Sequence, residues 1–190
     1  MSEYLNPRHT QRMTLPEYLE MEKRSPTRHE YVKGHVYPLA QESIRHNDII
    51  SNLTLALKPP ARAKKGKFVT ESVRCFISKL ERFYYPDMMV SCDPRDTDAF
   101  DLYYPCVVAE VVSPNSQHAD IWEKVHAYTS LPTLNRYLLI YQDRPQIDVY
   151  SWAGTSWIKY SVEEGNVELP SLNTHLDLKV VYEGIEFDAK

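Results

Sequence analysis

The sequence has little cysteine, no long apolar run and no excess of positive charge. Its 190 residues include three cysteines, Cys75, Cys92 and Cys106, and none of them forms a CxxC pair. This number and spacing exclude a disulfide framework and a zinc knuckle, so we expect reduced, mostly buried thiols. No apolar run approaches the roughly 18 residues of a membrane-spanning helix, and we therefore expect no membrane partner.

The charge and the N-terminus limit the class of protein further. The net charge is -4, whereas nucleic-acid-binding domains are usually basic overall or on one face. One basic run, KPPARAKKGK at residues 58–67, is either a solvated loop or a contact for DNA phosphates. Residues 1–13 are polar and lack the apolar core of a secretion signal, so we expect a flexible N-terminal arm on a cytoplasmic protein. The length predicts a single domain over residues 1–190.

Helix-start signals and apolar periodicity predict three helices. Thr14 followed by Pro16 predicts a short helix over residues 14–24. Apolar residues at helical spacing predict a second helix from about residue 43 to the Pro59-Pro60 pair, which should end it. Ser and Asn cap candidates at 113–116 begin a third predicted helix.

Strand-like segments lie between these helices, and the acidic stretch 92–101 is predicted to be an exposed loop. A continuous apolar strand followed by a helix and another apolar strand indicates a sheet covered on both faces. We therefore predict an α/β fold with a mixed central β-sheet flanked by helices. The predicted strands are a pair around Gly34 within 29–40, then 67–77, 83–91, 105–112, 136–143, 146–152, 156–162 and 175–182.

Two acids stand in unusually apolar surroundings. Glu110 lies inside the strand PCVVAEVV, near its C-terminal end, and Asp87 lies in the segment FYYPDMMVS. A buried carboxylate is costly unless it is paired, hydrogen-bonded or bound to a metal. Two such acids on neighbouring strands would suit Mg²⁺, for which a phosphodiester is the natural substrate. The simpler alternatives are a strand-start cap for Asp87 and a buried arginine partner for Glu110.

Several ordered motifs carry a resemblance to a known family. They are HEYVKGHVY, YYPDMMVS, VVAEVVSPNS, a D-x-x-x-K pattern at 120–124, and RYLLIYQ. In this order they resemble the Uma-type family, described as putative restriction endonucleases, within the PD-(D/E)xK nuclease superfamily. The resemblance covers roughly residues 14–155 and implies a restriction-endonuclease-like core.

The resemblance also implies roles for particular residues. Asp87 and Glu110 would bind Mg²⁺ or Mn²⁺, and Glu30 matches the first acid of the family. The sequence departs from the superfamily pattern because Val112 stands where a lysine is expected. Lys124, on the following helix, would replace that lysine and could be oriented by Asp120. His46 and Gln142 match positions that are often polar, and they are taken as pocket neighbours.

These observations predict a metal-dependent endonuclease that hydrolyses DNA phosphodiester bonds, with Asp87, Glu110, Lys124 and Glu30 as catalytic residues. One alternative is a non-catalytic relative with the same fold that binds nucleic acid, because the usual lysine is displaced. Another is a metal-dependent hydrolase of a different phosphoester. Taken alone, Lys124 would more often be a solvated helix lysine. A homodimer is expected, since duplex cutting needs one active site for each strand.

Overall fold

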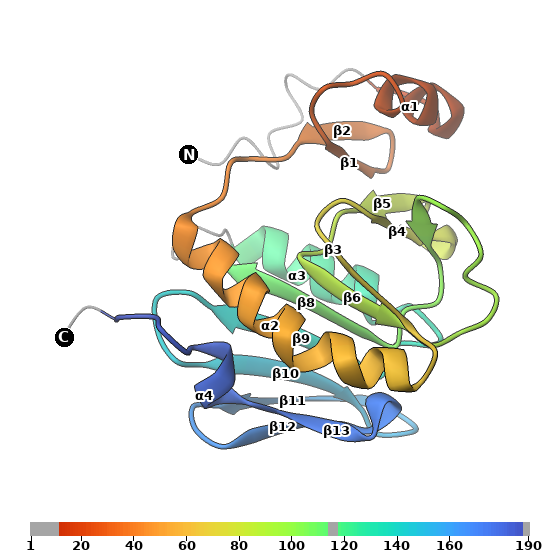
Figure 1. Cartoon of the computed structure of the whole chain (residues 1–190). Coiled ribbons are helices and arrows are strands. Elements are labelled where there is room, and N and C mark those ends of the chain that lie inside the picture. The colour runs from red at the N-terminus through yellow and green to blue at the C-terminus, as the bar shows by residue number, and fades with distance from the viewer. Residues whose placement is uncertain (1–11, 114–117, 188–190) are drawn as a thin grey trace.

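A six-stranded mixed β-sheet forms the centre of the molecule (Figure 1). The computed structural model describes residues 12–113 and 118–187. For residues 118–120 it describes only the backbone. Strands β8 and β9 are parallel and the other pairs are antiparallel. In spatial order the strands are β11 (Trp157–Val162), β10 (Ile147–Trp152), β9 (Arg136–Tyr141), β8 (Val107–Val112), β6 (Met88–Ser91) and β3 (Lys67–Thr70).

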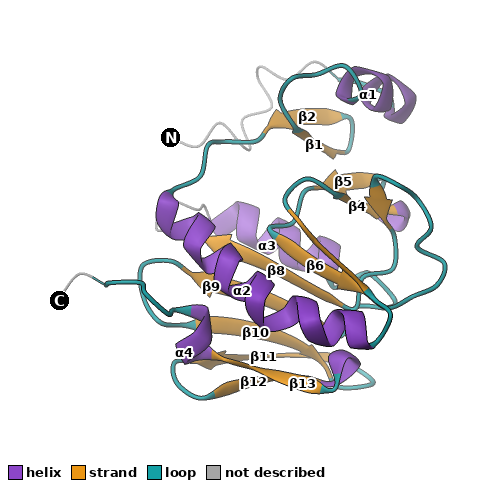
Figure 2. Ribbon diagram, in the orientation of Figure 1, coloured by secondary structure: helices purple, strands orange, loops and turns teal. Residues whose placement is uncertain are grey.

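Helices cover both faces of this sheet, as the fold class predicted (Figure 2). Helix α2 (Ile44–Ala63) packs Ile49, Leu53 and Leu57 against one face. Helix α3 (His118–Tyr128) packs Val125 and Tyr128 against the other. Helix α4 (Leu178–Val181) and the hairpin of β12 (Asn166–Leu169) and β13 (Thr174–Asp177) extend the core on the α2 side, with a short 3-10 turn at Pro170–Leu172. Alternate side chains of β8 therefore point into two separate apolar layers.

A second, five-stranded sheet carries the N-terminal region. Its spatial order is β2 (His35–Pro38), β1 (His29–Val32), β5 (Arg82–Tyr84), β4 (Arg74–Ile77) and β7 (Asp101–Leu102), and a short 3-10 turn, Ser78–Leu80, joins β4 to β5. Helix α1 (Leu15–Glu22) packs Tyr18 on Tyr31 and Phe83 of this sheet. The predicted cap is confirmed, because Thr14 and Glu17 form a reciprocal capping box.

The segment 82–91 connects the two sheets. Its first part is β5 of the five-stranded sheet, and its last part is β6 of the six-stranded sheet. Between these strands lie Tyr85, Pro86 and Asp87. The chain therefore changes sheets at Asp87, which brings residues of both sheets close to this acid.

Helix α2 does not end at the proline pair. It continues through Pro59 and Pro60 to Ala63. Ala61, one residue after the pair, is fully buried, and its carbonyl accepts the backbone N–H groups of Lys64 and Gly66. This burial and the C-terminal hydrogen bonds offset the N–H groups that the prolines lack.

The predicted strand over 175–182 is also wrong in its second half. Asp177 ends β13 and caps α4, because its side chain accepts the N–H of Lys179 at 2.9 Å. Leu178, Val181 and Tyr182 are buried at helical spacing. The cap and this spacing explain why a helix replaces the strand.

The acidic stretch 92–101 is less exposed than predicted. Asp96 is buried and accepts the N–H of Tyr103 at 2.7 Å. Asp101 belongs to β7 and forms a two-point ion pair with Arg74, at 2.6 and 3.0 Å. Both acids hold this segment in place and are unavailable as solvated charges.

Two further expectations concern the N-terminus and the membrane. Most of the predicted arm, residues 1–11, lies outside the described residues, whereas Met13 donates its N–H to Gly34 at 2.8 Å. A membrane-crossing helix is absent from the part of the chain that the structure describes, where no helix combines the necessary length with enough apolar character.

Candidate active site

The register of the central sheet brings Asp87 and Glu110 to the same place. Strand β6 pairs antiparallel with β8, and Met88 lies opposite Ala109. This pairing begins at Met88, one residue after Asp87, which therefore enters β6 beside the Glu110–Val111 segment of β8. Oδ2 of Asp87 accepts the N–H of Val111 at 2.6 Å, which fixes the carboxylate beside β8.

Glu110 is a buried carboxylate with two donors. Its Oε1 accepts the O–H of Tyr128 at 2.8 Å and a hydrogen bond from Nζ of Lys124 at 3.2 Å. Burial raises the pKa of Glu110 to about 8; the Lys124 ammonium opposes this shift, and the charges of Asp87 and Glu30 add to it. The raised pKa of Glu110 therefore reflects its burial from water and the presence of two other acids nearby.

Lys124 reaches into the site from α3. Its Nζ lies 3.1 Å from Oε1 of Glu30 and 3.2 Å from Oε1 of Glu110, and its side chain is 14% exposed. The ammonium also lies 5.7 Å from the ring centroid of Tyr84. The solvated-lysine alternative does not fit this geometry. The side chain of Asp120, its expected orienting partner, lies outside the described residues.

Glu30 comes from the other sheet. It lies in β1 and is 2% exposed. Its Oε1 lies 3.5 Å from the backbone N–H of Tyr85, two residues before Asp87. Thus the four predicted catalytic residues gather where the chain passes from one sheet to the other.

Gln142 and His46 border the site, as the resemblance implied. Gln142 is buried, and its Oε1 accepts the hydroxyl of Ser43 at 2.8 Å. The same hydroxyl oxygen accepts the N–H of His46 at 3.1 Å and caps α2. Ser43 therefore connects the end of β9 to the first turn of α2.

His46 is more than a neighbour of the site. It is 1% exposed, its Nε2 lies 3.2 Å from Oδ2 of Asp87, and its Nδ1 lies 3.9 Å from Oε1 of Glu71. Burial lowers the pKa of His46, but the hydrogen bond and charge of Asp87, with the charges of Glu42 and Glu71, outweigh it, so the pKa is raised. One ligand atom from each of His46, Glu71 and Asp87 lies within 4.8 Å of the others, a spacing that could hold a metal ion.

Glu71 was not predicted as a site residue, because no motif or periodicity marks it. It lies in the turn between β3 and β4 with φ +32°, and its N–H is directed at the carbonyls of Pro86 (3.1 Å) and Asp87 (3.4 Å). A positive φ is unusual for a residue with a side chain. Because contacts distant in sequence set its position, no local pattern could have identified it.

Comparison with known proteins agrees with this geometry. The Uma2 family, described as "Putative restriction endonuclease", matches residues 15–180. The chain belongs to the Uma2 family. The Uma2 match spans both sheets and all four predicted catalytic residues.

Individual relatives share most of the chain. Two proteins of Synechocystis sp., named uncharacterized proteins slr1290 and sll1609, are each 29% identical, over 90% and 84% of this chain and 92% and 93% of their own lengths. A crystal structure of a putative nuclease belonging to DUF820 from Anabaena variabilis aligns with a TM-score of 0.71 at 19% identity. The alignment covers 90% of this chain and 97% of that one. This structural likeness confirms the nuclease-type fold.

Proposed function

We propose that this protein is an endonuclease that hydrolyses DNA phosphodiester bonds with Mg²⁺ or Mn²⁺. The observation that carries the proposal is the Lys124 ammonium, within 3.2 Å of the buried carboxylates Glu30 and Glu110. Restriction-endonuclease-type proteins generally use a divalent ion, and membership of the Uma2 family supports the same chemistry.

Asp87 and Glu110 would hold the ion. Asp87 accepts the N–H of Val111, the residue after Glu110, and its charge acts on Glu110; hard oxygen ligands of this kind suit Mg²⁺. The bound ion would polarise the scissile phosphate and lower the pKa of the attacking water. A bound cation would also offset the burial, and the added charges of Asp87 and Glu30, that raise the pKa of Glu110.

The remaining residues position the two acids and stabilise the charge that develops on the phosphate. The N–H of Val111 holds Asp87, and the O–H of Tyr128 holds Glu110. Glu30 fixes the Lys124 side chain, whose positive charge stabilises the negative charge that builds on the phosphate. This role gives Lys124 the function of the lysine that Val112 replaces.

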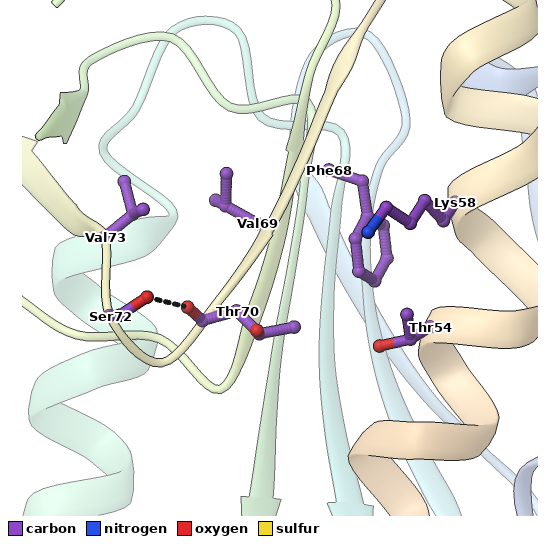
Figure 3. Close-up of a pocket in the computed structure, with 7 residues that line it drawn as sticks. All are labelled: Thr54, Lys58, Phe68, Val69, Thr70, Ser72 and Val73. Atoms are coloured by element: carbon purple, nitrogen blue, oxygen red, sulfur yellow. Dashed lines mark hydrogen bonds between the residues drawn. The ribbon is translucent and has the colours of Figure 1, made fainter. Parts of the chain in front are cut away.

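A cavity beside the site supports an extended substrate. Its volume is about 240 Å³. Figure 3 shows Lys58 reaching from α2 across the ring of Phe68, with Thr70 and Ser72 in the turn opposite. Since Glu71 lies between Thr70 and Ser72 in the sequence, the cavity is next to the turn that carries this acid. We infer that a DNA backbone passes here, with one phosphate near Lys58.

The exposed cations that follow Lys58 extend this path. Arg62, Lys64, Lys65 and Lys67 all lie on the surface. Phosphate contacts of this kind make DNA affinity fall steeply with salt. A salt-dependent affinity for duplex DNA therefore separates a DNA endonuclease from a hydrolase of another phosphoester.

We also propose a cytoplasmic homodimer that cuts both strands of a duplex. Apolar side chains are exposed on the outer strands of the central sheet, namely Trp152 at 41%, Ile158 at 49% and Tyr160 at 38%. An exposed sheet edge of this kind can pair with a second copy. Light scattering after size-exclusion chromatography measures the assembly directly.

The test uses supercoiled plasmid with Mg²⁺ or Mn²⁺. The wild-type protein should nick the plasmid, EDTA should abolish nicking, and Asp87→Ala should lose at least about 100-fold in rate, as for other transition-state charge stabilisers. Equal nicking by both proteins would reject the assignment. An inactive wild-type protein that still binds duplex DNA would favour the non-catalytic alternative.

A further inference from the structure

We propose that His46, Glu71 and Asp87 form a second cation site, selective for manganese-type transition ions over Mg²⁺. This site shares Asp87 with the Asp87–Glu110 pair but takes its other ligands from different segments. Ion binding at this site can be measured without DNA, so its test is independent of nuclease activity.

The three side chains are close enough to bind one ion. One donor atom from each lies within 4.8 Å of the others. A transition ion about 2.1 Å from each ligand spans up to about 4.2 Å between opposite ligands. The donors therefore need only a small inward movement, and further positions stay open to water or a phosphate oxygen.

His46 supplies an independent sign that a ligand is missing. The residue is 1% exposed, and Nδ1 is buried with no hydrogen-bond partner among the described residues. The acid nearest to it, Glu71, lies at 3.9 Å, beyond hydrogen-bond distance. A buried polar atom left in this state is costly and calls for a partner such as an ion.

The backbone holds the ligands in place before any ion arrives. Ser43 caps the helix turn that carries His46. The turn that carries Glu71 is clamped between the carbonyls of Pro86 and Asp87 and the guanidinium of Arg28, which donates to the Glu71 carbonyl. A positive φ of +32° at a residue other than glycine is strain of the kind that gathers at functional sites.

The ligand types decide which ion fits. Mg²⁺ prefers oxygen ligands and keeps several waters, whereas imidazole is a ligand of first-row transition ions, among which Mn²⁺ binds most weakly. The charge also favours a divalent cation, because the carboxylates of Glu42, Glu71 and Asp87 all act on His46. An oxygen-only pair at Asp87 and Glu110 would take Mg²⁺, while the imidazole favours a transition ion at the second position, for which Mn²⁺ is the spectroscopic probe.

Tag-free full-length protein provides the test, with Mn²⁺ alone as the probe at fixed pH. Spin-echo spectroscopy of bound Mn²⁺ should show coupling to an imidazole nitrogen, and His46→Gln should remove it. Calorimetry should show that Glu71→Gln weakens this Mn²⁺ binding at least about tenfold, while Mg²⁺ affinity changes less than about twofold.

Glu81→Gln is the matched control, because Glu81 is also a glutamate with positive φ, +51°, and it is exposed and lies outside the three-residue cluster. It should bind both ions like the wild type. Bound Mn²⁺ without nitrogen coupling, or wild-type Mn²⁺ affinity in Glu71→Gln, would overturn the proposal. If His46→Gln fails to fold, the Glu71 comparison still decides the question.

Discussion

Two buried acids of the central sheet, Glu110 in β8 and Asp148 in β10, show how differently one sheet treats a carboxylate. Their exposed fractions are 7% and 2%. The four donors to Asp148 are Lys159 (2.7 Å), Ser161 (2.6 Å), Gln146 (2.9 Å) and Tyr141 (3.1 Å). Although burial raises the pKa of Asp148, these partners outweigh it and leave the pKa below its usual value.

Glu110 lacks this compensation. Tyr128 and Lys124 both approach the same oxygen, and the nearby charges of Asp87 and Glu30 are negative. Its pKa is raised to about 8. Burial alone therefore does not mark a functional acid. The difference lies in whether the fold satisfies the carboxylate or leaves it among other acids, as at Glu110.

The largest expected difference between these two acids is in activity. Glu110→Gln should lower the rate of metal-dependent plasmid nicking by at least about 100-fold, because it removes a charge that would hold the ion. Asp148→Asn should stay within about threefold at 25 °C, since its partners lie away from the acids of the site. Initial rates at saturating Mg²⁺ measure both. Similar losses in the two variants would remove the distinction.

The sequence identifies Glu110 by the same signal that Asp148 carries. Each acid interrupts an apolar strand. What separates them is the cross-strand register. It places Ser161 directly opposite Asp148 and places Lys159 two residues from Ser161 on β11. Register over this distance is not readable from one sequence, so the pattern finds buried acids without sorting structural ones from functional ones.

The predicted site residues share a feature that Glu71 lacks. Glu110 stands in an apolar strand, Asp87 directly precedes one, and Lys124 lies at helical spacing from the apolar residues of α3. Periodicity predicts the faces of such elements. Glu71 lies in a turn whose position depends on backbone bonds to 86–87. The predicted helix end at Pro59 was wrong for a related reason, since the burial of Ala61 decided it, whereas the predicted strand beyond Asp177 was wrong because the local Asp177 cap and the helical spacing of buried residues were missed.

A second difference is expected in stability without metal ions. Asp148→Asn should cost about 1–3 kcal/mol, because four donors would face an amide in place of a carboxylate. Glu110→Gln should change the free energy of unfolding by less than about 1 kcal/mol at pH 5, close to the unfolded pKa. With a pKa of about 8, Glu110 is largely protonated there, and glutamine has nearly the same shape.

Urea unfolding in EDTA measures both values, provided that the dependence on urea has the same slope in all three proteins. Lys159→Met offers a further check, since it removes one donor to Asp148 and leaves Glu110 untouched. A larger loss of stability in Glu110→Gln than in Asp148→Asn would contradict the assignment of Asp148 as the satisfied acid.

A third difference is expected in the pH dependence of that stability. Glu110 has a folded pKa of about 8, above its unfolded value of 4.5, so the folded protein holds more protons between these values. Its favourable contribution is complete below pH 4.5 and is lost as the pH rises through 8. Asp148, with a lowered folded pKa, contributes above its unfolded value of 3.8 and loses that contribution only as the pH falls through its folded pKa.

The unfolding free energy of the wild type minus that of Glu110→Gln should therefore decline from pH 5 to pH 8. The decline should be at most about 1.4 kcal/mol per pH unit. The groups facing Glu110, namely Lys124, Tyr128, Asp87 and Glu30, share this titration and keep the observed slope below that limit. The corresponding difference in unfolding free energy between the wild type and Asp148→Asn should stay constant over the same pH range. Urea titrations in EDTA at each pH provide the unfolding free energies. The same pH dependence for both differences would show that Glu110 and Asp148 do not differ in their pKa shifts.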